Sequence, residues 1–227
     1  EAAVRFTGRR FLFWDLNTGT RRKRMPHEST QVSDDALATL VSAVGVIDEQ
    51  LQLLPGNDRL GYVGSDLPAV SRALARIQSE ELAGGSVFCD WGSGLGQVCA
   101  VAALHGFTSF GIEFQAELVN AARMLASKLG LAMTFAEGTF LQPGDHDFAI
   151  AGGHSELAFN SDAWNELGLS PADCHVVFAY PWPKEEALVD NTFLRHASPG
   201  ALLVTLHADD RVLVQRKVAD SSGLFTV

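Results

Sequence analysis

The stretch VFCDWGSGLGQ, residues 87–97, decides the fold of this chain. An apolar run ends at Asp90 and Trp91 and passes directly into glycines at alternate positions, Gly92, Gly94 and Gly96. Glycine adopts backbone angles that other residues avoid, and it lets another molecule approach the main chain closely. The stretch therefore predicts a strand, a tight turn and the start of a helix, with a ligand at the turn.

Strand and helix patterns alternate from this turn onward. The expected strands are 86–91, 109–114, 131–138, 173–180, 201–208, 211–218 and 223–227, and the expected helices are 95–106, 115–130, 155–168 and 184–197. Such alternation is typical of parallel strands joined by right-handed helical crossovers. The sequence predicts an α/β fold, a doubly wound Rossmann-like seven-stranded sheet with helices on both faces, whose last two strands form a closing hairpin.

The residues before the glycine turn form two further parts. Residues 1–30 alternate imperfectly around a turn signal at Asn17 to Gly19, which predicts an N-terminal basic β-hairpin extension. Residues 31–83 contain two helical patterns, with Ser33 and Ser65 as the expected caps. The predicted division is a hairpin over 1–30, a helical lead-in over 31–83 and a ligand-binding domain over 84–227.

Charge is distributed unevenly along the chain. The net charge is −10, but residues 1–24 hold seven basic and two acidic residues, so this segment carries +5 and the remainder −15. A basic arm on an acidic body can steer an acidic partner, and nucleic acid is a candidate partner for the predicted hairpin. A solvated hairpin without a partner is the simpler alternative.

Composition also limits the class of protein. No apolar run approaches the roughly 18 residues that a membrane span needs, so no membrane contact is expected. The three cysteines are odd in number and lack metal-ligand spacing, which predicts a reducing, cytoplasmic location and no metal site. Residues 145–147, Asp-His-Asp, are expected to form a solvated turn, because neighbouring side chains in an extended loop point apart.

The glycine turn discriminates between two kinds of ligand. A dinucleotide fingerprint reads G-x-G-x-x-G, whereas this turn reads G-x-G-x-G with Gln97 where the last glycine would stand. Asp90, two residues before the first glycine, would repel a diphosphate and attract an ammonium group. Glu113 ends the next expected strand, where its carboxylate can accept hydrogen bonds from two ribose hydroxyls. Together these features describe an amino-acid nucleoside.

The same features carry a family resemblance. The D-x-G-x-G-x-G turn at 90–96 and the strand-end Glu113 resemble the class I, seven-β-strand S-adenosylmethionine-dependent methyltransferases, over roughly residues 60 to 227. The segments GYVGSD (61–66), DWGSGLGQV (90–98), GIEF (111–114) and EGTF (137–140) are most similar to the non-SET protein-lysine methyltransferases. The resemblance implies S-adenosyl-L-methionine as cofactor, a methyltransferase domain over 84–227, and an amine such as a protein lysine as acceptor.

Several alternatives to this function stay open. They are a non-catalytic S-adenosylmethionine-binding module, a small-molecule or RNA methyltransferase, and a nucleotide-dependent oxidoreductase, which the position of Asp90 disfavours.

The resemblance also implies which residues bind the cofactor. Tyr62 would line its methionine end, Glu113 would hold the ribose, and the residues around Phe114 and Thr139 would flank the adenine. Many relatives have an Asp where Thr139 stands, and that Asp bonds the adenine amino group. The full expected set is Tyr62, Asp90, Gly92, Ser93, Gly94, Gly96, Gln97, Glu113, Phe114, Gly138 and Thr139.

The expected catalytic residues lie in the segment YPWP, residues 180–183. The resemblance implies that Tyr180 and Trp182 border the methyl group that is transferred. Methyltransferases that act on amines or nucleic-acid bases often have Asn or Asp, two prolines and an aromatic residue at this place. The lack of an amide or acid here favours a protein amine or a small molecule over a base. Trp182 as a core residue is the alternative.

Overall fold

The computed structural model describes residues 32–52, 62–154, 157, 161–207, 209, 211–218 and 224–227. The predicted N-terminal hairpin lies outside these residues. The division into three parts stays a prediction.

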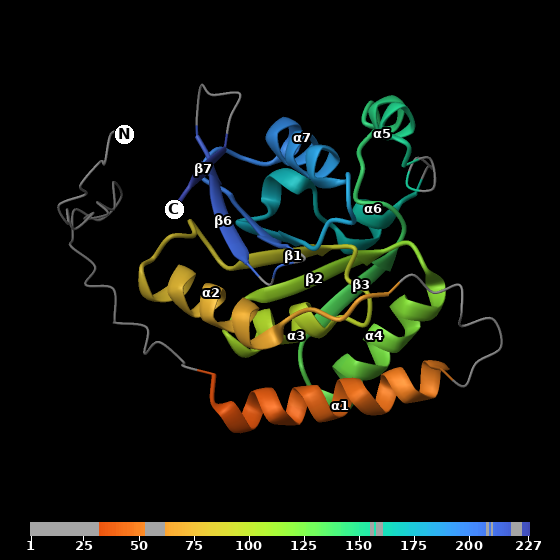
Figure 1. The fold of residues 1–227 in the computed structure, drawn as a ribbon, viewed down its shortest axis with the longest axis vertical. Helices are drawn as coiled ribbons and strands as arrows, with labels where there is room; N and C mark the ends of the chain where they lie inside the picture. The colour runs from red at the N-terminus through yellow and green to blue at the C-terminus, as the bar shows by residue number, and fades with distance from the viewer. Residues whose placement is uncertain are drawn as a thin grey trace.

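A seven-stranded sheet forms the centre of the molecule (Figure 1). Its strands are β1 (Val87–Trp91), β2 (Thr108–Glu113), β3 (Met133–Glu137), β4 (Val176–Ala179), β5 (Leu202–Leu206), β6 (Val212–Lys217) and β7 (Leu224–Thr226). Their order across the sheet is β3-β2-β1-β4-β5-β6-β7. Strands β1 to β5 pair in parallel, whereas β6 and β7 continue the edge in antiparallel pairing. The predicted Rossmann-like α/β class and its closing hairpin are confirmed.

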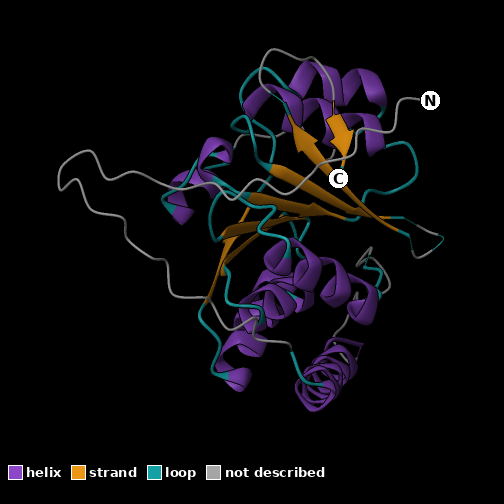
Figure 2. Ribbon diagram, turned by 90° about the vertical axis from the view of Figure 1, so that its left-hand side faces the viewer, coloured by secondary structure: helices purple, strands orange, loops and turns teal. Residues whose placement is uncertain are grey.

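Helices cover both faces of this sheet (Figure 2). One face packs against α2 (Leu67–Ser79), α3 (Gln97–Leu104) and α4 (Ala116–Leu129), whose apolar residues share one core with the strands. The other face packs against α5 (His146–Gly152), α6 (Ala163–Leu167) and α7 (Glu186–His196), whose buried residues form a second core, and the short η3 (Pro171–Asp173) contacts α7. Helix α1 (Asp34–Gln52) lies outside α4 and α3 as an additional layer. No helix of the described residues is long and apolar enough to cross a membrane.

Two predictions about the helices are wrong in detail. Asp66, not Ser65, caps α2, because its carboxylate accepts a hydrogen bond from the backbone N–H of Ala69 at 2.8 Å. Acidic side chains are as suitable as serine at this position. Of the helix expected over 155–168, α6 covers Ala163–Leu167, while residues 155, 156 and 158–160 lie outside the described residues; the sequence patterns did not predict α5. Both α5 and α6 are short, so they show too few turns for a helical period to be recognised.

The sheet order determines where a ligand can bind. From β1 the chain continues to β2 and β3 on one side, and then returns to place β4 on the other side of β1. The helices that follow β1 and β4 therefore leave from opposite faces and open a crevice at the carboxyl ends of these strands. Along this edge the strand ends follow the order β3, β2, β1, β4, β5. Residues just after each strand are thereby lined up across the crevice.

Candidate functional site

A cavity of about 1060 Å³ occupies this crevice. It lies at the upper end of the range of roughly 300–1,000 Å³ for ligand pockets. Every predicted site residue except Gly96 lines it. The structure therefore brings together residues 62, 90–97, 113–114, 138–139 and 180–182, which the sequence places in five separate segments.

The glycine turn is held in left-handed backbone conformations. The φ angles are 79° at Gly92 and 51° at Gly94, a region that favours glycine. The N–H groups of Gly92 and Ser93 both donate to the carbonyl of Ile112, at 2.9 and 3.0 Å, which fixes the turn against β2. A Cβ atom on Gly94 would lie 2.9 Å from the ring of Tyr62, so that ring packs directly against the turn.

Gly96 differs from the other predicted site residues in its surroundings. It does not line the cavity, and a Cβ atom there would lie 2.6 Å from the ring of Phe135 and 3.0 Å from the Cβ of Ala122. Phe135 belongs to β3 and Ala122 to α4. Gly96 therefore permits the close packing of α3 against its neighbours, and its contact with a ligand stays a prediction.

Asp90 is a buried carboxylate on the wall of the cavity. Its side chain is almost fully buried, and burial together with the nearby charge of Glu113 raises its pKa well above the usual value. Its Oδ2 accepts a hydrogen bond from the Sγ of Cys99 at 3.9 Å. No basic side chain of the described residues pairs with Asp90. A buried carboxylate without a cation is costly, so a cationic group of a ligand would stabilise it strongly.

Glu113, the last residue of β2, is a second buried carboxylate on the cavity wall. Its Oε2 accepts a hydrogen bond from the N–H of Gly94 at 2.9 Å, and its Oε1 accepts one from the N–H of Gln115 at 3.0 Å. Burial raises the pKa of Glu113, while these hydrogen bonds lower it. These two hydrogen bonds fix the orientation of Glu113. Each carboxylate oxygen can still accept a second hydrogen bond from a ligand.

The far end of the cavity is formed by residues that follow β2 and β3. Phe114 is 40% exposed and offers a ring face at the mouth. The hydroxyl oxygen of Thr139 accepts a hydrogen bond from the N–H of Leu141 at 3.2 Å and keeps a second lone pair. Gly138 is needed for packing, because a Cβ atom there would lie 2.4 Å from the hydroxyl of Ser161.

Two buried polar atoms on the cavity wall have no hydrogen-bond partner among the described residues. They are the indole nitrogen of Trp91 and the hydroxyl of Ser93. Buried polar groups in folded proteins are nearly always hydrogen-bonded. Both atoms are buried beneath the cavity surface, so these two residues depart from that pattern.

Tyr180 and Trp182 line the opposite end, directly after β4. The side chain of Trp182 is 48% exposed, so the alternative of a core tryptophan is wrong. Its backbone N–H donates to Oε2 of Glu185 at 2.9 Å, which ties the YPWP segment to the start of α7. Proline on each side of Trp182 restricts the backbone further.

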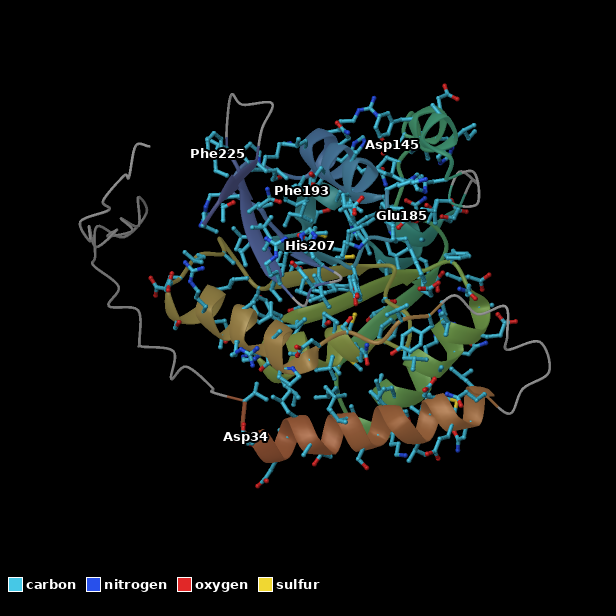
Figure 3. The ribbon with its side chains drawn as sticks, viewed as in Figure 1. Asp34, Asp145, Glu185, Phe193, His207 and Phe225 are labelled. Carbon is cyan, nitrogen blue, oxygen red and sulfur yellow. The ribbon has the colours of Figure 1, made fainter. Side chains whose placement is uncertain are left out.

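Sequence reasoning missed four residues at this end of the cavity. They are His154, Glu185, Glu186 and His207. Figure 3 shows Glu185 and His207 in the same part of the molecule, between α7 and the sheet in this view. They come from segments that are far apart in the chain. The order of the strand ends could have found one of them, His207, because it predicts that residue 207 lies near residue 180. No sequence pattern indicates the other three.

The predicted solvated turn at 145–147 is also wrong in part. The side chain of Asp145 is 1% exposed and forms an ion pair with Arg195 of α7. Its other oxygen accepts a hydrogen bond from the N–H of Gln142 at 3.0 Å. This network joins α5 to α7. Among the described residues, no group of three His, Cys, Asp or Glu side chains is placed to hold a metal ion.

The charge of the cavity has one sign. Four carboxylates line it, those of Asp90, Glu113, Glu185 and Glu186. No lysine or arginine is among the described residues on its wall. A low-dielectric cleft with charges of one sign concentrates ligands of the opposite charge. The cavity is therefore suited to a cationic ligand and not to a phosphate.

Comparison with known proteins gives similarity at the level of structure alone. No protein-family model matches the chain, and no curated protein matches its sequence. An RNA methyltransferase from Salinibacter ruber in complex with S-adenosyl-L-homocysteine is 22% identical, over 73% of this chain and 94% of that one, with a TM-score of 0.44. The CcbJ methyltransferase from Streptomyces caelestis is 17% identical, over 70% of this chain and 54% of that one, with a TM-score of 0.43.

A third similar structure is an S-adenosylmethionine-dependent methyltransferase from Thiobacillus denitrificans in complex with S-adenosyl-L-homocysteine. It is 19% identical, over 61% of this chain and 47% of that one, with a TM-score of 0.37. This chain spans about half the length of the last two proteins. None of the three is described as a protein-lysine methyltransferase, so the finer likeness to that group gains no support. Any assignment of function must therefore come from the site.

Proposed function

We propose that this protein is an S-adenosyl-L-methionine-dependent methyltransferase that acts on an amine, for which a protein lysine is one candidate. The observation that carries the proposal is the cavity at the switch point of the sheet, with Asp90 and Glu113 buried beside a glycine turn and no basic side chain among the described residues on its wall. S-adenosyl-L-methionine is a cation with an α-ammonium group, a ribose and an adenine.

The residues present are suited to each part of this molecule. Asp90 would pair with the α-ammonium group, which supplies the cation that this buried carboxylate lacks. Glu113 would accept hydrogen bonds from the ribose hydroxyls with its remaining lone pairs. Phe114 and Thr139 would flank the adenine, and Tyr62 would cover the methionine end.

A nucleotide-dependent oxidoreductase is less compatible with this site. A dinucleotide brings a diphosphate to the glycine turn, where the N–H groups of a helix N-terminus usually bind it. Here Gly94 donates its N–H to Glu113, and the N–H groups of Gly92 and Ser93 are bonded to Ile112. The diphosphate would therefore meet buried carboxylates in place of available donors.

The acceptor end supports an amine rather than a nucleic-acid base. Proteins that bind nucleic acid place lysine and arginine against its phosphates. Glu185 and Glu186 line this end of the cavity instead, and they would attract an ammonium group. Tyr180 and the YPWP segment add apolar surface suited to an alkyl chain.

The chain itself contributes position, desolvation and charge to the reaction. When bound, the cofactor supplies a methyl group already activated by a sulfonium. Tyr180 and Trp182 would exclude water and hold the amine in line with that group, and effective molarity from such positioning is worth about 7–11 kcal/mol. Desolvation between these rings lowers the pKa of an amine and favours its neutral, nucleophilic form.

Calorimetry with three ligands tests the proposal. We expect S-adenosylmethionine and S-adenosylhomocysteine to bind to the full chain, and NAD to give no measurable heat at the same concentrations. Binding of NAD alone would contradict the proposal. Incubation of a cell extract with methyl-labelled cofactor then separates an enzyme from a binding module, because an enzyme transfers label to an acceptor. Amino-acid analysis of the labelled product distinguishes a methylated lysine from a labelled small molecule or RNA.

A further inference from the structure

His207 lies where an acceptor would meet the methyl group. It directly follows β5, and the β4–β5 register places Ala179 opposite Thr205. Tyr180, one residue after Ala179, and His207, two residues after Thr205, therefore lie at the same edge of neighbouring strands, and both line the cavity. Because β5 is the next strand after β4 in the sheet, His207 lies beyond Tyr180 as seen from the cofactor turn.

The imidazole of His207 is held by one of its nitrogens. Its Nε2 lies 3.0 Å from the hydroxyl oxygen of Thr205, a buried residue of β5. The backbone N–H of His207 donates to the carbonyl of Arg211 at 3.0 Å, which fixes the main chain. Among the described residues, Nδ1 has no hydrogen-bond partner. The ring is therefore positioned by one nitrogen, and the other can exchange a proton with a ligand.

An acidic side chain on α7, Asp190, lies near this imidazole. Asp190 is half-buried; burial raises its pKa, the nearby Glu186 raises it further, and His207 lowers it. Glu186 lies one turn before Asp190 on the same helix and lines the cavity. Asp190 therefore lies close enough to His207 for their charges to interact.

The other charged groups at this end already have partners. His154 lies 3.7 Å from Glu185, measured from Nδ1 to Oε1, and its Nε2 lies 3.2 Å from the carbonyl of Lys184. Glu185 also accepts a hydrogen bond from the backbone N–H of Trp182. In the loop after His207, Arg211 pairs with Asp209. His207 is therefore the imidazole of the cavity whose arrangement leaves a nitrogen for the acceptor.

We infer that His207 is the catalytic base that takes a proton from the ammonium form of the acceptor amine. This inference rests on the proposed function. An N–H bond of the ammonium breaks, its electron pair stays on nitrogen as the lone pair needed for attack, and the proton forms a new bond to Nδ1 of His207. The resulting imidazolium lies near Asp190 and later releases the proton to water. Histidine suits this task because its charge typically changes between about pH 5 and 8.

An analogue that carries its own amine tests the inference without a known acceptor. The probe is S-adenosylhomocysteine with nitrogen in place of sulfur and a 4-aminobutyl arm on that nitrogen. The matched neutral probe has a 4-hydroxybutyl arm. Calorimetry at pH 5.5 and pH 8 measures the affinity for each probe. The ratio of the two affinities at each pH is the preference for the amino arm over the hydroxyl arm. In the wild-type protein we expect this preference to fall on the order of tenfold at the lower pH, because an imidazolium repels the ammonium arm.

Variants of the full chain decide the outcome. His207→Gln should give a preference that no longer changes between the two pH values. His146→Gln, an imidazole outside the cavity, should behave as wild type. The same pH dependence in His207→Gln and wild type would overturn the inference. Failure of wild type to bind S-adenosylhomocysteine at all would instead overturn the proposed function, so the two failures are distinguishable.

Discussion

The two ends of the cavity differ in how their residues are distributed along the chain. The cofactor end is formed largely by residues 90–97 and Glu113, all within one strand–helix–strand unit. The acceptor end gathers His154, residues 180–183, Glu185, Glu186 and His207 from three separate segments. The first end is determined by local backbone geometry, whereas the second exists only once the whole sheet has formed. A substitution at one end of the cavity should therefore leave the properties of the other end unchanged.

The largest effect is expected at the acceptor end, from Trp182→Ala. Methyl transfer in a single turnover should fall by on the order of a hundredfold, because the ring no longer positions the acceptor. Affinity for S-adenosylhomocysteine should stay within a few-fold, and the melting temperature should hardly change, since Trp182 is 48% exposed.

Phe225→Ala is the matched control for this variant. Phe225 is another exposed aromatic residue, on β7 and away from the cavity, and its loss should leave transfer unchanged. A large loss of S-adenosylhomocysteine affinity in Trp182→Ala would show that the two ends are not separate.

The next effect is expected at the cofactor end, from Asp90→Asn. The amide keeps the shape of the carboxylate but loses the charge that would pair with the α-ammonium group. Hydrogen bonds to charged groups are worth about 1.5–3 kcal/mol, so affinity for S-adenosylmethionine should fall by about 10- to 100-fold. Calorimetry measures this change, and Asp147→Asn, outside the cavity, should keep wild-type affinity. Equal affinities for wild type and Asp90→Asn would remove the main support for the proposed cofactor.

The same variant should stabilise the protein without ligand at neutral pH. Burial raises the pKa of Asp90 in the folded state, so its contribution to stability is fully present below its unfolded pKa and is lost as pH rises through the folded pKa. Asp90→Asn removes this loss. The melting temperature of the variant should exceed that of wild type at pH 7, and the difference should shrink as pH falls towards about 4. A variant less stable than wild type at pH 7 would show that the carboxylate is already compensated.

The sequence predicts the two ends unequally for physical reasons. Alternate glycines after Asp90 impose backbone angles that can be recognised in eleven residues, and Glu113 follows because a strand end is recognisable. The arrangement of His154, Glu185 and His207 depends on helix–sheet packing, which no local pattern encodes. The sequence also does not distinguish two uses of glycine. Gly96, which permits packing against Phe135, looks the same as a glycine that contacts a ligand. Asp145, buried against Arg195, likewise has a partner 50 residues away.

Glu113→Ala should have an intermediate effect. Its carboxylate fixes the turn through Gly94 and would accept two ribose hydroxyls, so its loss should weaken binding of S-adenosylmethionine at least about tenfold. Binding of 5′-methylthioadenosine, which has the ribose and no amino-acid part, should fall by a similar factor. Asp90→Asn should leave the affinity for that compound unchanged. If both variants affected both ligands equally, the division of labour between the two carboxylates would be wrong.

The smallest effects on affinity are expected at two glycines of the same turn, which should respond in opposite ways. A Cβ atom on Gly92 would meet nothing within 4 Å, and Gly92 lines the cavity, so Gly92→Ala places a methyl group in the space of the ligand. Affinity should fall several-fold, with a loss of stability of roughly 1–2 kcal/mol from the left-handed backbone.

Gly96→Ala has the same backbone cost and must also displace Phe135, which adds about 1–3 kcal/mol. Its folded protein should still bind S-adenosylmethionine within a factor of about two, because the packing of α3 against β3 is disturbed and the cavity wall is not. Urea unfolding beside calorimetry measures both quantities, and a Gly96→Ala protein that is stable but binds poorly would return Gly96 to the ligand site.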